Sequence, residues 1–414
     1  MRVLWFTLPF SNYGKPSESY NGGGWVSSLE KELKKNSNIE LGISFFLDEA
    51  KDGIIDGVSY FPMDRPFNKW IKLKYILSMR SVKCMDKDLW SNYEREILRV
   101  VNRFKPDIIQ IFGSEECFGL IANKTKIPVV IHIQGIINPY INAFLPPFFS
   151  WETFLKSPFK LWKYYNRCTI RGMWKAQSER EKEIYRRCNY YIGRTEWDKR
   201  ITMLMNKNAK YFFGSEILRP AFYLSGKRIL PEKLIIISTI SSPLYKGYDL
   251  ILKTADLLKQ YSQVDFEWKV FGNIDPIMVE KQIQIRHGNV NVFLKGVATA
   301  EQLRAALLEC TIYVHSSYID NSPNSVCEAQ ILGCTVITTN AGGMPSLMKN
   351  GISGFNVPTN DPYQMASLIL EIYNDPEKNI KIGKTAESIA KQRHDKSAIV
   401  KNLINIYNNM IKDE

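Results

Sequence analysis

Short runs rich in β-branched residues alternate with amphipathic stretches along most of the chain, and this alternation limits the possible folds most strongly. It predicts βαβ units, in which helices join parallel strands and cover both faces of a sheet. In the first half, the expected strands are Val3–Leu8, Leu41–Phe46, Ile108–Ile111, Val129–Ile133 and Tyr190–Gly193, with helices at Trp25–Lys35 and Trp90–Phe104. In the second half, the expected strands are Leu234–Ile240, Trp268–Phe271, Val290–Leu294, Ile312–His315 and Thr335–Thr338, with helices at Gly247–Tyr261, Ala300–Glu309, Ser325–Leu332 and Pro362–Asn374. We therefore expect an α/β protein with two Rossmann-like, doubly wound domains.

The domain boundary is expected where this periodicity stops. Gly226 and Pro231 interrupt the pattern. This predicts an N-terminal domain over 1–222 and a C-terminal domain over 223–395. The remaining segment, 396–414, is predicted to be a helix with no strand after it, which can pack back on the N-terminal domain.

The composition is typical of a soluble globular protein. No apolar run approaches the roughly 18–20 residues of a membrane-spanning helix, and the first apolar stretch is broken by Pro9, which favours a buried strand over a signal peptide. The seven cysteines form no CxxC pair and only four histidines occur, so neither a disulfide framework nor a zinc site is expected. We expect a cytoplasmic protein, because scattered cysteines fit a reducing compartment.

The formal net charge of +13 is unevenly distributed. Residues 1–222 contain 35 Lys and Arg against 23 Asp and Glu, whereas residues 223–414 contain 20 against 19. A basic first half indicates a polyanionic neighbour: a nucleic acid, an anionic membrane or an acidic acceptor.

One segment differs from the rest in composition. Pro146–Lys175 contains nine aromatic residues, six Lys or Arg and a single acid, Glu152. It is either a helical insert that packs its aromatics on the N-terminal domain or an element that binds an anionic membrane surface. A nucleic-acid surface is the weakest alternative, because no known binding module is present.

A glycine-rich stretch, Gly22–Leu33, follows the first expected strand and opens a helix. Glycines let the backbone approach a phosphate, and a helix N-terminus supplies amide donors. Tight packing of strand against helix is the structural alternative. The GxGxxG spacing of dinucleotide-binding proteins is missing, which disfavours a dehydrogenase.

A second stretch, Ser241–Leu258, places Lys246 and Gly247 between a strand and a helix. Open α/β sheets bind ligands at the carboxyl ends of their strands. A lysine at this position can offer its charge to a diphosphate, although many lysines at helix starts are only solvated.

The most informative stretch is His315–Pro358, in which a strand leads to Asp320 and then to a helix containing Glu328. The free amides at the start of this helix can bind a phosphate; they belong to Asn324, Ser325 and Val326. The carboxylate of Glu328 can accept hydrogen bonds from both hydroxyls of a ribose, and Asp320 can reach a sugar attached to the phosphate. The structural alternative is a capped helix with an ordinary acid.

Residues 234–360 resemble the donor half of the retaining, GT-B-fold glycosyltransferases of family four. The resemblance rests on an acid followed at eight residues by Glu-Ala, a Gly-Cys-x-Val strand, a Gly-Gly-x-Pro turn and a Lys-Gly pair. These are Asp320, Glu328-Ala329, Gly333–Val336, Gly342–Pro345 and Lys246-Gly247. Gly22–Trp25 resembles the family's glycine loop, which meets the donor phosphate and the acceptor. The stretches at 106–116, 131–136, 192–198 and 215–223 resemble bacterial members that build surface polysaccharides.

The resemblance implies two domains facing across a cleft and retaining transfer from a nucleotide-diphosphate sugar to a saccharide or lipid-linked saccharide. It implies Lys246 and Asp320 as catalytic residues and no metal. The implied donor-binding residues are Gly23, Gly24, Gly272, Val297, Asn324, Ser325, Val326 and Glu328, and the acceptor-side candidates are Glu115, His132 and Gln134. A lipid-linked acceptor implies a peripheral location at the inner membrane face. The alternatives are an epimerase or phosphorylase on the same fold, or a weakly catalytic sugar-nucleotide-binding subunit; a nucleic-acid partner is not expected.

The sequence departs from the family pattern at several positions. Ile240 and Ser241 stand where the family has a diphosphate-binding Arg. The diphosphate charge is therefore expected to be met by Arg219, by a cation of the N-terminal domain, or only by Lys246 and the helix amides. Ser346 stands where the family has a Glu directly after the Gly-Gly-x-Pro turn. Gln134 occupies the usual place of a cleft histidine, and His132 lies two residues earlier.

Overall fold

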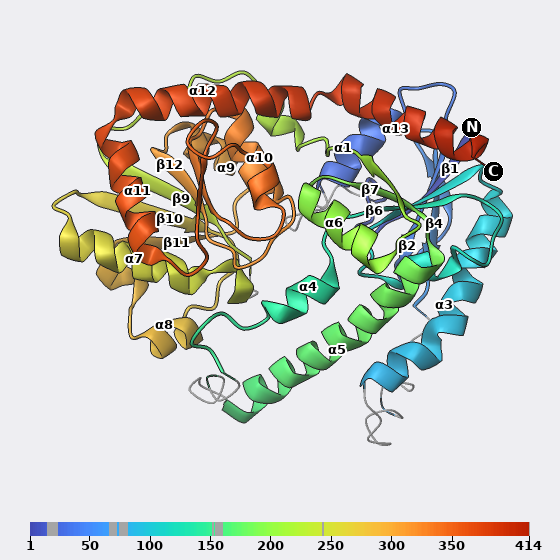
Figure 1. Ribbon diagram of the computed structural model, residues 1–414. Helices are drawn as coiled ribbons and strands as arrows, with labels where there is room; N and C mark the ends of the chain where they lie inside the picture. Colours follow the sequence, from blue (N-terminus) through green and yellow to red (C-terminus); the bar gives the residue numbers. More distant parts are fainter. Residues whose placement is uncertain are drawn as a thin grey trace. The chain divides into compact units, whose positions relative to one another are not determined.

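The computed structural model describes residues 1–14, 24–65, 73, 82–150, 153, 160–241 and 244–413 (Figure 1). The chain divides into two compact units. The N-terminal unit consists of 1–141, 167–217 and 395–414, and the C-terminal unit consists of 142–166 and 218–394.

The N-terminal unit is built on an eight-stranded sheet with the order β3-β4-β2-β1-β5-β6-β7-β8. Its strands are β1 (Arg2–Phe6), β2 (Glu40–Phe46), β3 (Gly53–Ile55), β4 (Val58–Met63), β5 (Ile108–Phe112), β6 (Val129–His132), β7 (Tyr190–Gly193) and β8 (Lys210–Phe213). Only β3, at the edge, runs antiparallel to its neighbour among the described strands. The inner strands β1, β5 and β6 are almost wholly buried, as apolar runs covered on both faces should be.

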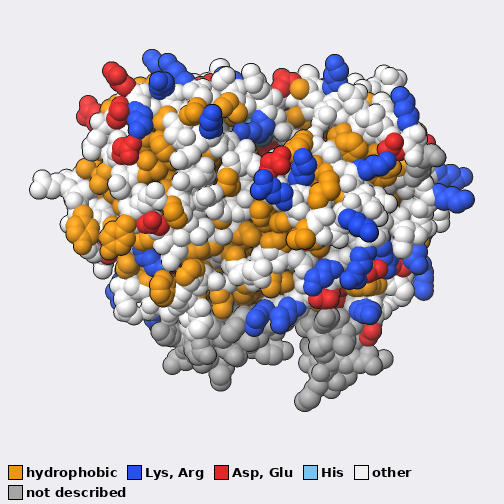
Figure 2. All heavy atoms as spheres, viewed as in Figure 1, with side chains coloured by type: hydrophobic (Ala, Val, Ile, Leu, Met, Phe, Trp, Pro, Cys, Tyr) orange, Lys and Arg blue, Asp and Glu red, His pale blue; other side chains and the backbone are white. Residues whose placement is uncertain are grey.

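The helices of this unit follow the strands of the sheet. They are α1 (Gly24–Leu33), α3 (Val82–Phe104), α4 (Ile137–Asn142), α5 (Lys160–Arg187), α6 (Glu196–Met205) and α13 (Lys396–Lys412); α4 and α5 each include residues grouped with the other unit. α6 begins with a capping box, in which Thr195 and Asp198 satisfy each other's amides. On the face shown in Figure 2, Lys and Arg side chains gather over α5 and α6, where Lys182, Arg186 and Arg200 are exposed.

The C-terminal unit has a six-stranded, wholly parallel sheet with the order β11-β10-β9-β12-β13-β14. Its strands are β9 (Leu234–Thr239), β10 (Phe266–Phe271), β11 (Val292–Gly296), β12 (Ile312–His315), β13 (Val336–Thr339) and β14 (Phe355–Val357). Its helices are α7 (Tyr248–Tyr261), α8 (Ile277–Ile283), α9 (Ala300–Leu308), α10 (Asn324–Ile331), α11 (Pro362–Asn374) and α12 (Pro376–Arg393).

Apolar side chains fill both faces of this second sheet. Along β9, Ile236 belongs to one buried cluster and its neighbour Ile237 to another, because successive side chains of a strand point to opposite faces. A sheet covered on both faces confirms the expected doubly wound α/β fold in this unit.

The structure divides the chain at places that differ from the expected boundaries. Leu218, Ala221 and Phe222 were assigned to the N-terminal domain, but all three are buried in an apolar cluster of the C-terminal unit. The boundary therefore lies at 217/218. The final helix α13 is grouped with the N-terminal unit, where Tyr407 is buried.

The aromatic segment Pro146–Lys175 also requires a correction. Its described beginning belongs to the C-terminal unit, because Phe149 is buried in the core cluster of that unit and the carbonyl oxygen of Phe148 accepts a hydrogen bond of 2.7 Å from Gln282. From residue 167 onward the chain is grouped with the N-terminal unit. Much of the segment, including Glu152 and Lys156, lies outside the described residues.

Candidate active site

The junction between β9 and α7 holds the expected Lys-Gly pair in a close-packed turn. Leu244–Lys246 form one turn of 3-10 helix, and Gly247 has φ of +77°. A Cβ atom on Gly247 would lie 2.0 Å from the carbonyl oxygen of Ser316, so only glycine permits this contact. The Ser316 hydroxyl donates to the carbonyl oxygen of Lys246 at 3.0 Å. The glycine therefore allows the loop after β12 to fix the backbone of the lysine.

The Lys246 side chain forms an ion pair with Asp320, as their shared place at the carboxyl ends of the strands allows. Nζ of Lys246 lies 2.6 Å from Oδ2 of Asp320. Nε2 of His315, at the end of β12, lies 3.0 Å from the same oxygen, and the Asn321 amide donates to Oδ1 at 3.1 Å. The carboxylate thus has a described partner on each oxygen and orients the lysine.

The charges of this group stabilise one another. Although burial raises the pKa of Asp320, the opposing charge of Lys246 and the His315 hydrogen bond hold it well below its usual range. Burial lowers the pKa of Lys246, but Asp320 more than compensates and raises it overall. Both groups are therefore ionised at neutral pH. Burial lowers the pKa of His315 despite the nearby carboxylate.

The Gly-Gly turn after β13 supports Asp320 through its backbone. The Gly343 amide donates to the carbonyl oxygen of Asp320 at 2.8 Å. Gly342 has φ of +58°, and a Cβ atom there would lie 1.9 Å from that same oxygen. The turn can approach the acid only because it lacks side chains.

Two more expected donor-binding residues lie at the ends of neighbouring strands. Gly272 follows β10 with φ of +129°, and a Cβ atom on it would lie 1.8 Å from the carbonyl oxygen of Ile240. Its amide donates to Gly296 at the end of β11, and the next residue, Val297, is 56% exposed. Backbone groups and one exposed apolar side chain therefore line this edge, as a planar base would require.

The start of α10 gives its three candidate amides different roles. The Val326 amide donates to the carbonyl oxygen of Pro323 at 3.0 Å, so it is already satisfied. Within the described ranges, no hydrogen bond is recorded for the amides of Asn324 and Ser325. An anion at this helix N-terminus would therefore meet two open amides rather than three.

Glu328 lies in α10 with its side chain only 3% exposed, and its partner is Arg219. Nε of Arg219 lies 2.7 Å from Oε1 of Glu328, and Nη2 lies 2.8 Å from Oε2. Burial lowers the pKa of Arg219, but the carboxylate raises it overall. The hypothesis that Arg219 meets the donor diphosphate is thus not supported, because its guanidinium is engaged with the ribose-binding candidate. The sequence did not predict this ion pair. Its only local signal was the stretch Leu218–Pro220, directly after the boundary at 217/218.

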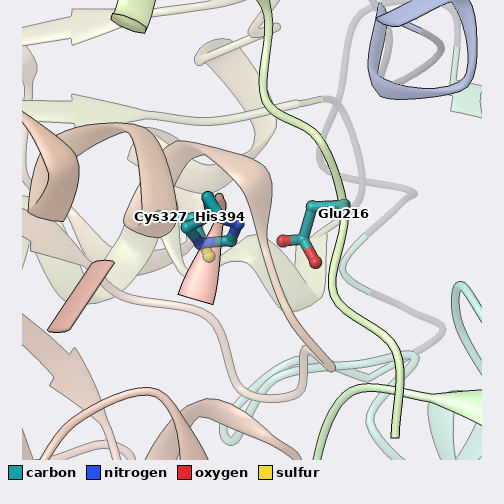
Figure 3. Close-up of side chains that lie close together, drawn as sticks. All are labelled: Glu216, Cys327 and His394. Atoms are coloured by element: carbon teal, nitrogen blue, oxygen red, sulfur yellow. The ribbon is translucent and has the colours of Figure 1, made fainter. Parts of the chain in front are cut away.

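The end of α12 anchors α10 on the side away from the sheet. Arg393 donates to Gln330 of α10 at 2.9 Å, and the side chains of His394 and Cys327 lie close together (Figure 3). Figure 3 also labels Glu216, which belongs to the N-terminal unit. Residues after the donor motifs therefore help to fix the helix that carries Glu328.

In the N-terminal unit, the acceptor-side candidates lie at the carboxyl ends of β5 and β6. Glu115 accepts from the Gly135 amide at 3.1 Å, and burial raises its pKa to about 7. His132 is buried at the end of β6, with Nδ1 3.2 Å from Nε2 of Gln110. Burial lowers the pKa of His132 to about 3. Gln134 is half-buried two residues further on.

A residue that the sequence reasoning did not single out completes this edge. Arg194 follows β7, which pairs with β6, and its guanidinium lies over the ring of Trp25 at 4.4 Å. Trp25 belongs to the first turn of α1, which begins at Gly24. Gly23, the other glycine of this candidate loop, lies outside the described residues.

Comparisons with known proteins agree with this arrangement. A family model described as "Glycosyl transferases group 1" matches residues 225–389. Over 159 residues the chain is 24% identical to the amylovoran biosynthesis glycosyltransferase AmsK of Erwinia amylovora. This match covers 36% of the chain and 39% of AmsK, so it spans well under half of that relative.

Solved structures match along the whole length. The sucrose-phosphate synthase of Thermosynechococcus elongatus gives a TM-score of 0.71 at 12% identity, covering 100% of both chains. Anabaena HepE, solved with UDP and glucose, gives 0.62 at 17% identity, covering 99% of this chain and 100% of its own. At these identities the likeness establishes the fold. The chain thus carries a group 1 glycosyltransferase domain and has the two-domain GT-B fold of such transferases.

Proposed function

We propose that the protein transfers a sugar from a nucleotide-diphosphate donor to a hydroxyl of a saccharide or lipid-linked saccharide, with retention at the anomeric carbon. One observation carries the proposal: Lys246 is held as a cation by Asp320 at the carboxyl ends of β9 and β12. Open α/β sheets bind ligands at such an edge. The glycosyltransferase domain covers the same residues.

Lys246 is proposed to stabilise the leaving group. As the bond from the anomeric carbon to the diphosphate breaks, negative charge grows on the departing oxygen. A cation already fixed in place stabilises that charge without reorganisation. The acceptor oxygen forms the new bond, and its proton leaves with the nucleotide diphosphate. No metal or other cofactor takes part in this proposal.

The remaining donor contacts are proposed from the same unit. Glu328 binds the ribose hydroxyls, Gly272 and Val297 border the base, and the open amides of Asn324 and Ser325 receive a phosphate oxygen. Because HepE was solved with UDP and glucose, a uridine nucleotide is the first donor to test.

We propose a peripheral place at the inner membrane face for polysaccharide assembly. No helix in the described ranges is long and apolar enough to cross a membrane. Phe148, at the start of the aromatic segment, is 78% exposed, and such a side chain can insert at an interface. The excess of Lys and Arg in residues 1–222 would favour anionic lipid.

The test begins with thermal stabilisation by UDP-, GDP- and ADP-sugars, because a ligand that binds the native state raises its melting temperature. The stabilising donor is then supplied with lipid-linked saccharides, and the anomeric configuration of the product is read by NMR. Transfer with retention is expected. Epimerisation of the donor without any acceptor, or binding without turnover, would contradict the proposal.

A further inference from the structure

Three side chains at one edge of the N-terminal sheet carry buried polar atoms that lack a hydrogen-bond partner within the described chain. These atoms are Oε2 of Glu115, Nε2 of His132 and Nη2 of Arg194. Glu115 and Arg194 follow β5 and β7, and His132 is the last residue of β6; these three strands are consecutive in the sheet. Buried polar groups are nearly always satisfied, so such a group calls for a missing partner. The carboxyl edge of a parallel sheet is where ligands bind.

A chain of hydrogen bonds fixes which atom of His132 carries the proton. Nε1 of Trp5 donates to the Tyr407 hydroxyl at 3.1 Å, and that hydroxyl donates to Oε1 of Gln110. Gln110 must then present its amide group to Nδ1 of His132. Nδ1 therefore accepts, and Nε2 carries the proton. Since burial lowers the pKa of His132 to about 3, the ring is neutral and Nε2 is a fixed donor.

Arg194 supplies a second donor beside it. Its side chain is 5% exposed, and Nε lies 3.3 Å from Oε2 of Glu216, an ion pair whose geometry falls short of a hydrogen bond. The ring of Trp25 contacts both the Arg194 guanidinium, at 4.4 Å, and the His132 ring, at 5.1 Å. Glu216 approaches the Nε side, so Nη2 is left for another acceptor.

The surroundings favour an anionic acceptor over a neutral one. Trp25 lies in the first turn of α1, a helix of ten residues whose N-terminus attracts negative charge. Burial raises the pKa of Glu115 to about 7, so this carboxyl is only about half ionised at neutral pH and repels an anion less than an ordinary carboxylate does. Arginine binds carboxylate and phosphate oxygens with its planar fork. The excess of basic residues in 1–222 adds a long-range attraction for acidic ligands.

We propose that this edge is a subsite for an acidic group on the acceptor sugar, bound by Nη2 of Arg194 and Nε2 of His132. The inference rests on the proposed function, because it names the class of acceptor: a saccharide with a carboxylate, as in a uronic acid, or with a phosphate. Trp25 holds the two donors in position, and Glu216 helps to hold the guanidinium in place.

The experiment compares three sugars by ligand-observed NMR on the full-length protein: methyl glucuronoside, glucose 6-phosphate and methyl glucoside. Binding of at least one acidic sugar at least tenfold tighter than methyl glucoside is expected. The first two sugars distinguish a carboxylate from a phosphate ligand. Arg194→Met should remove the preference, Arg194→Lys should retain part of it, and Arg200→Met, which changes an exposed arginine of α6, should leave it unchanged.

The variant Arg194→Met leaves Glu216 without its ion pair, so the double variant R194M/E216Q is measured beside it. A folded double variant that keeps the preference for acidic sugars would overturn the proposal, and so would equal binding of all three sugars to the wild type. Donor binding and sugar transfer are followed separately. If transfer is absent while the preference for acidic sugars depends on Arg194, the proposed function fails and the subsite stands.

Discussion

The guanidinium of Arg219 faces the carboxylate of Glu328 along its side, with Nε 2.7 Å from Oε1 and Nη2 2.8 Å from Oε2. Each carboxylate oxygen has a second lone pair, so the pair can still accept hydrogen bonds from a diol. The arginine therefore orients the acid without occupying all of its capacity. This bidentate pair holds a buried carboxylate of α10 in one orientation.

Glu328→Gln should weaken donor binding, because an amide oxygen accepts hydrogen bonds less strongly than a carboxylate. Charge-assisted bonds contribute roughly 1.5–3 kcal/mol, so a loss of about tenfold or more in donor affinity or kcat/KM is expected. Isothermal titration with the stabilising nucleotide sugar measures it. Glu309→Gln, at an exposed site of the same unit, is the control. Unchanged affinity in a variant with the wild-type melting temperature would remove Glu328 from the nucleotide site.

Lys246→Ala should lower kcat more than it raises the donor KM, because the charge that Lys246 stabilises grows only as the glycosidic bond breaks. Steady-state kinetics at varied donor concentration separate the two parameters. A raised KM with a normal kcat would show that Lys246 only binds the donor.

Asp320→Asn should shift the alkaline limb of the pH–kcat profile to lower pH. The ion pair raises the pKa of Lys246, and its charge is present below that pKa and lost as the pH rises through it. Without the carboxylate, burial is opposed mainly by Tyr245 and the pKa of Lys246 falls. The profile is recorded from pH 6 to about 10.5, near the ordinary lysine pKa. An alkaline limb that does not move would indicate that Lys246 does not titrate in the rate-limiting step.

Gly342→Ala should impair both stability and turnover, and Gly351→Ala is its matched control. Both glycines have positive φ, where a side chain costs about 1 kcal/mol. At Gly342 the new Cβ would also lie 1.9 Å from the Asp320 carbonyl oxygen, whereas nothing lies within 4 Å at Gly351. Thermal melts and kcat are compared. Equal effects of the two changes would show that the close contact does not position Asp320.

Tyr407→Phe should allow His132 to adopt either neutral tautomer and should lower the free energy of unfolding. It leaves Nε1 of Trp5 and Oε1 of Gln110 without their buried partner, at a cost of about 1–3 kcal/mol. Tyr363→Phe, at a site 67% exposed, should be neutral. Nitrogen-15 NMR of the labelled histidines reports the tautomer directly. A pure Nε2–H signal for His132 in the variant would mean that Tyr407 does not set it.

The aromatic segment leads to a prediction that rests on sequence alone. Lys156, Lys160, Lys163 and Arg167 lie where no side chain is described. Each cation near an anionic surface contributes about 1 kcal/mol before screening. Binding to anionic vesicles with partial release at high salt is expected, and replacing the four with Gln should weaken it. Equal cosedimentation of wild type and variant would indicate that the segment is a packed insert and not a membrane-binding element.

Several features were predictable because their signals are local in the chain. Alternation of β-branched and amphipathic runs gave most of the inner strands, since each pattern is set by neighbouring residues. The sequence placed Lys246 and Asp320 each after such a strand, but it did not predict their ion pair, in which the two side chains lie 2.6 Å apart. Four strands were missed. The edge strands β3, β8 and β14 are short, with little periodicity, and the inner strand β4 contains Pro62, which argues against a strand.

The grouping of segments was less predictable. The sequence favoured packing of 146–175 on the N-terminal domain, yet Phe149 is buried in the other unit. Which core an aromatic side chain joins depends on the space that distant segments leave, and composition does not report that space.

The sequence by itself determined the two α/β sheets and the glycines, lysine and acids of the donor edge, because strand periodicity and turn chemistry are properties of contiguous residues. Only the tertiary structure decided the partners of the buried polar groups. Arg219 forms hydrogen bonds with Glu328, which lies 109 residues away in the chain, and Tyr407 donates to Gln110, which lies 297 residues away. Such pairs form because a buried charge or hydroxyl must be satisfied by whichever group packing brings beside it. That group can lie anywhere in the chain.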